Sequence, residues 1–377
     1  MTLKLGLVGG GPGAFIGAVH RMAARLDGRW ELVAGALSSD PMRAAASATD
    51  LGISADRSYS HFAEMAQAEA ARPDGIDAVA IVTPNHLHAD VATAFLRAGI
   101  AVICDKPMTA TLPEAEELAA LARETAVPFV LTQTYTGYPM VREARRMIAE
   151  GAIGAVRHVQ VEYLQDWLTG PVENSGQKQA VWRTDPRMSG EGGCIADIGT
   201  HAVNLATFVT GLELQAVFAD LSAFEPGRRL DDNAAVLLRF NRGAKGMIWA
   251  SQITPGTKNA LRFRIAAEKG GLAWDQENPD FLEFTPTGKA TRLLRRADGL
   301  SRTPARIPAG HPEGYLEAFA TLYRDAADMI ERRDAVDTKT LADAQDGLAG
   351  MRFISACVRS SAAGGVWVAA ASEAVGC

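Results

Sequence analysis

Closely spaced cysteines are missing from this sequence. Its four cysteines are scattered over 377 residues, at Cys104, Cys194, Cys357 and Cys377, and none belongs to a C-x-x-C pair. Disulfide-stapled secreted domains and structural zinc sites both depend on closely spaced cysteines. We therefore expect neither a disulfide framework nor a bound metal, and the pattern fits a reducing compartment.

The sequence also has no surplus of basic residues and no long apolar run. It carries 38 Lys and Arg against 44 Asp and Glu, a formal net charge of −6. This balance argues against a nucleic acid or an anionic membrane as the main partner. No segment approaches the roughly 20 apolar residues of a membrane-spanning helix, and the apolar start at residues 3–8 is too short for a signal peptide. We expect a cytoplasmic protein.

The length of the chain and a change in its pattern indicate two domains. In the first part, short apolar segments alternate with helical ones, which is typical of a parallel sheet covered on both faces. Strands are expected there at 3–8, 30–37, 77–83, 101–104 and 128–132. Longer alternating segments follow and predict a largely antiparallel sheet. They lie at 156–166, 214–223, 233–240, 245–252, 261–268 and 280–285.

The change of pattern falls near residues 133–138. We therefore expect a first domain over residues 1–135 and a second over residues 136–377, in an α/β fold overall. Two helical stretches close the chain, at 313–333 and 339–360, and they could pack back on the first domain.

A glycine-rich turn follows the first expected strand and opens a helix. Gly9, Gly11 and Ala14 fit the pattern G-x-G-x-x-A, in which glycines let the backbone approach a pyrophosphate at a helix N-terminus. A plain strand-to-helix turn is the alternative. The pattern favours a dinucleotide site, with contacts expected from Gly9, Gly11, Pro12, Gly13, Ala14, Phe15 and Ile16.

The residues after the second expected strand bear on the choice of cofactor. An acidic side chain at this position binds the ribose hydroxyls of NAD, and this chain has Ser38, Ser39 and Asp40 there, with Arg43 nearby. Asp40 fits either a ribose contact or a helix cap. Arg43 fits either a 2′-phosphate contact or a solvated charge, so these residues leave the cofactor preference open.

Polar residues follow two further strands, where ligands of open α/β sheets bind. Thr83, Pro84, Asn85 and His88 follow one strand, and Lys106 follows the next. We predict that these residues contact the cofactor. A lysine ammonium near a nicotinamide could also polarise a substrate oxygen, although a lysine at a strand end is commonly a surface charge.

Asp197 and His201 are the candidate pair in the second part of the chain. Their i, i+4 spacing places them on one face of an expected helix that begins near residue 198. Histidine exchanges protons near neutral pH, and a neighbouring carboxylate can orient it or the substrate. A capped helix with a buried histidine is the alternative.

Together these motifs resemble the Gfo/Idh/MocA oxidoreductase family. The resemblance rests on the glycine loop, Thr83 to His88, Lys106-Pro107, Trp182-Arg183 and Gly193 to His201, and it covers most of the chain. It implies a Rossmann domain, that is, a doubly wound parallel sheet, followed by an α+β domain with an open-faced, largely antiparallel sheet that is often used in oligomer contacts. The family's catalytic lysine, aspartate and histidine correspond to Lys106, Asp197 and His201. The family usually has Glu before the lysine, where this chain has Asp105.

The extended glycine loop and the segment from Gly310 to Tyr315 resemble a narrower group, the scyllo-inositol dehydrogenases that also oxidise L-glucose. This likeness implies NAD rather than NADP, direct hydride transfer from a cyclic polyol or aldopyranose, and a homo-oligomer such as a dimer or tetramer. The expected substrate contacts are Gln165, Trp167, Arg183, Asp185, Asp197, His201 and His311.

Three other functions remain open at the level of sequence. A redox-neutral, NAD-dependent glycosidase or dehydratase could use the same fold. A cofactor-sensing protein without activity is a second possibility, although it would not need a lysine, aspartate and histidine set. A metal-dependent hydrolase is the third, although the sequence shows no cluster of metal ligands. The fold alone would not separate these functions.

Overall fold

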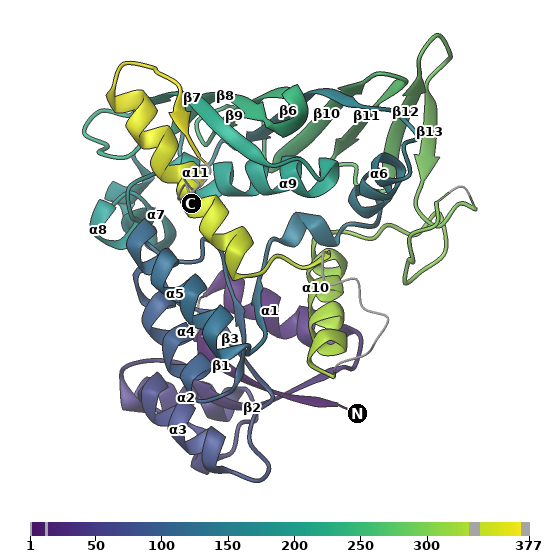
Figure 1. The fold of residues 1–377 in the computed structure, drawn as a ribbon. Helices are drawn as coiled ribbons and strands as arrows, with labels where there is room; N and C mark the ends of the chain where they lie inside the picture. The colour runs from purple at the N-terminus through teal and green to yellow at the C-terminus, as the bar shows by residue number, and fades with distance from the viewer. Residues whose placement is uncertain (1, 12–13, 300, 332–339, 371–377) are drawn as a thin grey trace. The chain divides into compact units, whose positions relative to one another are not determined.

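The computed structural model describes residues 2–11, 14–299, 301–331 and 340–370. The chain divides into two compact units (Figure 1). Unit 1 comprises residues 1–137 and 315–348, and unit 2 comprises residues 138–314 and 349–377.

The core of unit 1 is a five-stranded sheet in the order β2-β1-β3-β4-β5. Every neighbouring pair in this sheet is parallel, which confirms the α/β pattern expected from the sequence. The strands are β1 (Leu3–Gly9), β2 (Trp30–Ala36), β3 (Ala78–Val82), β4 (Ala101–Cys104) and β5 (Phe129–Leu131).

Helices cover the sheet of unit 1, and one of them comes from far along the chain. Helix α10 (Tyr315–Ile330) packs beside α1 (Phe15–Leu26) (Figure 1). Phe319 and Tyr323 of α10 join the same buried core as Val19 of α1. The other helices of this unit are α2 (Pro41–Asp50), α3 (Phe62–Ala71), α4 (His88–Arg97) and α5 (Leu112–Thr125), with short turns η1 (Ala55–Arg57), η2 (Asn85–Leu87) and η3 (Thr134–Gly137).

Unit 2 is built on a nine-stranded sheet in the order β13-β12-β11-β10-β6-β9-β8-β7-β14. Neighbours are antiparallel except β6 and β9, which run parallel, so the expectation of a largely antiparallel sheet is confirmed. The strands are β6 (Val156–Leu164), β7 (Leu214–Ser222), β8 (Asn233–Phe240), β9 (Lys245–Ser251), β10 (Ala260–Ala267), β11 (Gly270–Asp275), β12 (Phe281–Pro286), β13 (Arg292–Arg295) and β14 (Val368–Ala369).

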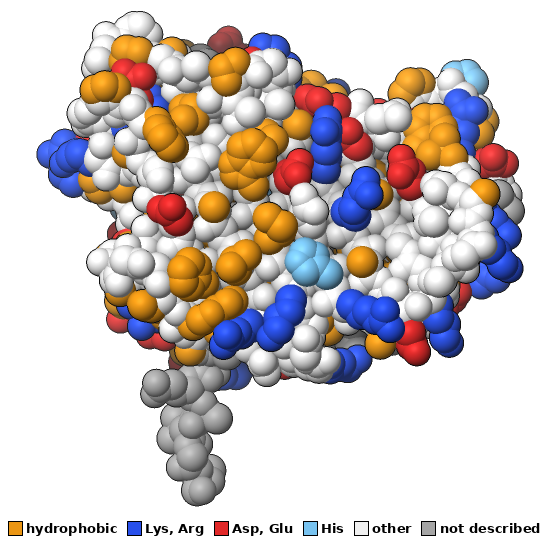
Figure 2. Space-filling model, turned by 90° about the horizontal axis from the view of Figure 1, so that it is seen from above, with side chains coloured by type: hydrophobic (Ala, Val, Ile, Leu, Met, Phe, Trp, Pro, Cys, Tyr) orange, Lys and Arg blue, Asp and Glu red, His pale blue; other side chains and the backbone are white. Residues whose placement is uncertain are grey.

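Helices cover one face of this sheet, and the other face is open. One face is covered by α9 (Thr200–Thr210), which packs on β6 and β9, and by α6 (Pro139–Ala149), which packs on β11 and β12. On the other face Leu237, Met247 and Trp249 remain 47%, 37% and 40% exposed. In Figure 2, which views the molecule from above, apolar side chains lie between acidic and basic ones.

The remaining helices are α7 (Lys178–Arg183), α8 (Pro186–Ser189) and α11 (Ala344–Ala362), with turns η4 (Val172–Ser175), η5 (Ile195–Gly199) and η6 (Asn241–Gly243).

Candidate active site

The glycine turn after β1 has the close packing that a dinucleotide fingerprint requires. Gly9 and Gly10 adopt positive φ angles of 81° and 70°, a region that favours glycine. A Cβ atom on Gly17 would lie 2.5 Å from the Cα atom of Gly10, so the start of α1 approaches the loop more closely than any side chain permits. This is the packing role of glycine in Rossmann turns. The predicted contacts Pro12 and Gly13 lie outside the described residues.

The strand-end residues after β2 cap the next helix. Asp40 is the N-cap of α2, and its Oδ1 accepts a hydrogen bond of 3.0 Å from the amide of Arg43. The Ser38 hydroxyl oxygen accepts from the Asp40 amide at 3.1 Å. Asp40 therefore has the capping role that the sequence left open, and its exposed carboxylate stays at the end of the strand.

His88 connects the turn after β3 to the loop after β4. Its side chain is buried, with Nδ1 2.8 Å from the carbonyl oxygen of Pro107 and Nε2 2.9 Å from that of Thr83. Burial lowers the pKa of His88, because water no longer solvates the charged ring. These contacts give His88 a role in fixing both loops. Asn85 is buried in η2, beside the same turn.

Asp105 directly precedes Lys106, and neighbouring side chains anchor its carboxylate. Its Oδ1 accepts a hydrogen bond of 2.9 Å from the Thr132 hydroxyl and lies 3.7 Å from Nε2 of buried His20. Burial opposes ionisation of this carboxyl group, but interactions with His20, Lys106 and His88 outweigh it and lower the pKa of Asp105 to about 2. The peptide bond between Lys106 and Pro107 is cis. Asp105, which is shorter than the glutamate usual in the family, is thus still charged and anchored beside Lys106 in the sequence.

We expect Asp105 to make folding depend on pH under acidic conditions. Because its pKa in the folded protein is about 2, below the usual value of about 3.9, the ionised group stabilises the fold above pH ~4. That contribution, on the order of 2–3 kcal/mol, is lost as the pH falls toward 2. Urea midpoints of the wild type and Asp105→Asn should differ at pH 6 and converge near pH 2. An equal difference at both pH values would contradict this assignment.

Asp197 lies in a π-helical turn rather than in a regular helix. This turn, η5, leads directly into α9, whose first turn carries His201. Single π-helical turns occur frequently at functional sites. Oδ2 of Asp197 accepts hydrogen bonds from Arg183 Nε at 3.2 Å and from Gln252 Nε2 at 2.9 Å. The guanidinium of Arg183 also stacks 4.2 Å from the centre of the Trp182 ring.

Hydrogen bonds extend from Asp197 into a network of amide side chains. Gln165 Oε1 accepts from Gln252 Nε2 at 3.2 Å and from Trp167 Nε1 at 2.9 Å. Gln165 Nε2 donates to Asn259 Oδ1 at 3.0 Å, and the hydroxyl of Tyr163 donates to the same oxygen at 2.7 Å. We call these six residues and Arg183 the Asp197 network. Its members are Tyr163, Gln165, Trp167, Arg183, Asp197, Gln252 and Asn259.

The structure thus brings together four of the substrate residues predicted from the sequence, namely Gln165, Trp167, Arg183 and Asp197. The ring of Tyr163 lies 6.1 Å from that of His201, which is a fifth. Sequence reasoning missed Tyr163, Gln252 and Asn259. The parallel pairing of β6 with β9 explains the miss, because it aligns Leu164 with Ser251 and so places Gln165 and Gln252 at one edge.

Two predicted substrate residues have other partners. Asp185 caps α8 and forms ion pairs with Arg187 at 2.7 Å and Arg229 at 3.1 Å. The hydrogen bond from Arg187 is the main cause that lowers the pKa of Asp185 to about 2. The side chain of His311 is exposed, while its backbone carbonyl accepts from buried Arg296.

Polar side chains dominate the Asp197 network. Among them, no group of three or more His, Cys, Asp or Glu side chains could hold a metal ion. In the same residues, no helix combines the length and apolar character needed to cross a bilayer. The Asp197 network presents amide, carboxylate and guanidinium groups beside a histidine. That set can bind hydroxyl groups and transfer a proton.

Comparisons with known proteins match both parts of the chain. Residues 3–134 match the model of an oxidoreductase family with an NAD-binding Rossmann fold, and residues 141–273 match that of the GFO/IDH/MocA C-terminal domain. A levoglucosan dehydrogenase of Pseudarthrobacter phenanthrenivorans is 30% identical over 75% of this chain and 76% of its own.

Solved structures resemble the chain over almost its whole length. An oxidoreductase from Sinorhizobium meliloti is 51% identical, covers 98% of this chain and 99% of its own, and has a TM-score of 0.89. An inositol dehydrogenase homologue from Azotobacter vinelandii, solved with NADH and myo-inositol, is 34% identical over 98% of both chains, with a TM-score of 0.88. The protein therefore belongs to the Gfo/Idh/MocA family and is an oxidoreductase with an NAD-binding Rossmann domain, related to dehydrogenases of polyols and sugars.

Proposed function

We propose that the protein oxidises a neutral cyclic polyol or aldopyranose, of the scyllo-inositol or L-glucose type, with NAD as the hydride acceptor. The Asp197 network is the observation that carries this proposal. Its amide groups match the donors and acceptors of a ring with several hydroxyls. Arg183 is already paired with Asp197, so this cation does not call for an anionic substrate. Relatives that bind myo-inositol or levoglucosan support the same substrate class.

In the proposed reaction, the nicotinamide ring supplies the hydride acceptor at its C4 atom. His201 takes the proton of the reacting hydroxyl, while Lys106 binds that oxygen and stabilises the charge that develops on it. Asp197, held by Arg183 and Gln252, orients the substrate. A ketone or a lactone results, depending on which carbon loses the hydride.

The residues proposed to hold the cofactor follow the strand ends of unit 1. Gly9, Gly11, Ala14, Phe15 and Ile16 would surround the pyrophosphate, and Ser38, Ser39, Asp40 and Arg43 the adenosine ribose. Thr83, Pro84, Asn85, His88 and Lys106 would lie toward the nicotinamide. Pro12 and Gly13 complete the proposed loop.

We expect NAD to be preferred over NADP. The exposed carboxylate of Asp40 stays at the end of β2, where it would repel a 2′-phosphate and accept hydrogen bonds from a free ribose. The ratio of kcat/KM for the two cofactors measures this preference, and Asp40→Ser should shift it toward NADP. A clear advantage of NADP in the wild type would refute the assignment.

The experiment that tests the proposed function follows absorbance at 340 nm with NAD and a panel of substrates. The panel contains scyllo-inositol, myo-inositol, L-glucose and D-glucose, together with phosphorylated sugars and sugar acids. We expect net NADH formation with a neutral cyclic polyol or pyranose. A best substrate that is anionic would contradict the proposal. Product formed without net NADH would instead favour a redox-neutral glycosidase or dehydratase.

We also propose that a second copy of the chain covers the open face of the unit 2 sheet. Leu237, Met247 and Trp249 are partly exposed on this face, and water contact with such apolar area is unfavourable. The double variant Leu237→Glu, Trp249→Glu should lower the mass measured by light scattering to that of a smaller assembly. Leu26→Glu, at an exposed position on α1, is the control. An unchanged mass in the double variant, or a monomeric wild type, would contradict the proposal.

A further inference from the structure

The loop between β7 and β8 carries Arg228, Asp231 and Asp232, charged residues that the proposed reaction does not use. We call residues 223–232 the Arg228 loop. The side chains of Arg228 and Asp232 are 1% and 0% exposed, and they form an ion pair of 3.0 Å. Asp231 is partly buried, and the loss of contact with water raises its pKa. Burying charge in this way is costly unless the groups are fully hydrogen-bonded.

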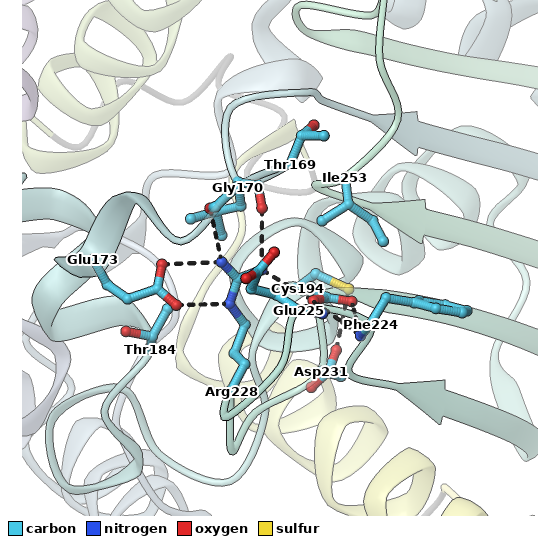
Figure 3. Close-up of polar contacts among 12 residues, drawn as sticks. Thr169, Gly170, Glu173, Thr184, Cys194, Phe224, Glu225, Arg228, Asp231 and Ile253 are labelled. Carbon is cyan, nitrogen blue, oxygen red and sulfur yellow. Dashed lines mark hydrogen bonds and ion pairs between the residues drawn. The ribbon is translucent and has the colours of Figure 1, made fainter. Parts of the chain in front are cut away.

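Asp231 binds three consecutive amides that lead into the π-helical turn of Asp197. Its Oδ1 accepts from Gly193 N at 2.6 Å, and its Oδ2 accepts from Ile195 N at 2.8 Å. Its backbone carbonyl accepts from Cys194 N at 2.8 Å. A Cβ atom on Gly193 would lie 2.0 Å from that carbonyl oxygen, so the contact requires glycine at this position. One residue therefore fixes the start of η5, and Figure 3 labels Asp231 and Cys194.

Asp232 and Arg228 hold two further segments that carry members of the Asp197 network. The carbonyl of Asp232 accepts from the amide of Gln252 at 2.9 Å. Arg228 Nη1 donates to the carbonyl of Leu168 at 3.1 Å, and Nη2 donates to that of Gly170 at 3.2 Å. Arg228 also pairs with Glu173 at 3.0 Å, and Figure 3 shows Arg228 bonded to Glu173 and Gly170.

Each of the three segments held by the Arg228 loop carries members of the Asp197 network. One carries Gln165 and Trp167, the next carries Asp197, and the third carries Gln252. The amide of Leu168 donates to the carbonyl of Gln252 at 3.0 Å, which ties the first segment to the third. The Arg228 loop thus joins these segments through Arg228 and Asp232, which are buried, and through Asp231, which is partly buried.

We propose that Asp231 is a positioning residue for the reaction, and that the Arg228 loop sets the geometry of the substrate site through it. This inference rests on the proposed function, because the geometry matters for oxidation of a polyol bound at the Asp197 network. A carboxylate can accept at both oxygens, whereas an asparagine amide turns one of them into a donor. Asp231→Asn would place an N–H group against the amide of Gly193 or of Ile195 and shift the turn that carries Asp197.

The kinetic test compares Asp231→Asn with Glu143→Gln. Glu143 of α6 is a matched control, because it is a buried carboxylate of unit 2 that accepts from Arg302 N and the Thr303 hydroxyl, both at 3.2 Å. In Asp231→Asn we expect kcat for the polyol to fall by roughly a hundredfold, as for a reacting group displaced by ~1 Å, with a raised KM for the polyol. The Kd for NAD should change less than about twofold. A deuterium isotope effect at the reacting carbon should increase. Glu143→Gln should lose stability but keep kcat and KM.

A second readout does not depend on activity. Hydrogen–deuterium exchange of the amides at 193–199 and 252 should become faster in Asp231→Asn and remain unchanged in Glu143→Gln. If the wild type oxidised no polyol, the proposed function would fail, and the exchange rates would still decide whether Asp231 fixes the turn. Wild-type values of kcat, KM and exchange in a folded Asp231→Asn protein would overturn the inference.

Arg228→Lys provides a variant for the case in which Asp231→Asn does not fold. Lysine keeps the charge but cannot bind Glu173 and two carbonyls with a planar fork. We expect a several-fold higher KM for the polyol, a smaller change in kcat and faster exchange around residue 168. A protein with wild-type KM and exchange would overturn the role of the Arg228 loop.

Discussion

His201→Ala is expected to reduce polyol oxidation by at least about a thousandfold, within the range found for loss of a general acid–base group. His201 lies in the first turn of α9, directly after the turn that carries Asp197, and is only 7% exposed. Because a base must be unprotonated to act, wild-type oxidation should rise with pH as the histidine loses its proton, and then level off. Initial rates of NADH formation between pH 5 and 9 give both results.

The control for this variant is His158→Ala, at an exposed histidine on β6, which should keep wild-type kinetics. Binding of NAD to His201→Ala, followed by calorimetry, should persist, because the cofactor is proposed to bind through residues of unit 1. Loss of NAD binding together with activity would show that His201 supports the fold rather than the chemistry.

Lys106→Met is the second change with a large expected effect. Methionine keeps much of the side-chain length but removes the ammonium group, so the developing charge on the substrate oxygen loses its partner. We expect kcat to fall by at least about a hundredfold. Lys106 directly follows Asp105, whose carboxylate accepts a hydrogen bond from the Thr132 hydroxyl. Lys289→Met, at an exposed turn, serves as the control, and near-normal turnover in Lys106→Met would eliminate the proposed role.

The elements with clear local signals were predictable from the sequence. The strand expected at residues 30–37 is β2 (Trp30–Ala36), and helix α5 begins after Thr111, which forms a reciprocal capping box with Glu114. Strand β11 was missed because it begins with Gly270 and Gly271, which are unfavourable in strand interiors. The short strand β13 was also missed, since its four residues are too few to show a period.

The candidate site was predictable only in part. Asp197 and Arg183 stand in motifs that the sequence shows, Gly193 to His201 and Trp182-Arg183, and Gln165 lies in the strand expected at 156–166. The partners Gln252 and Asn259 could not be found, because their proximity depends on β6 pairing in parallel with β9 and antiparallel with β10. Sequence reasoning also placed Asp197 in a regular helix, whereas it lies in a π-helical turn held by Asp231.

Transfer of deuterium is the measurement that tests the central claim most directly. Scyllo-inositol or L-glucose deuterated at the carbon that is oxidised would be incubated with the enzyme and NAD, and the NADH analysed by mass spectrometry. Direct hydride transfer from a polyol predicts NADH that carries one deuterium at C4 of the nicotinamide, in an amount equal to the ketone or lactone formed. NADH without deuterium, or consumption of the polyol without net NADH, would contradict the account.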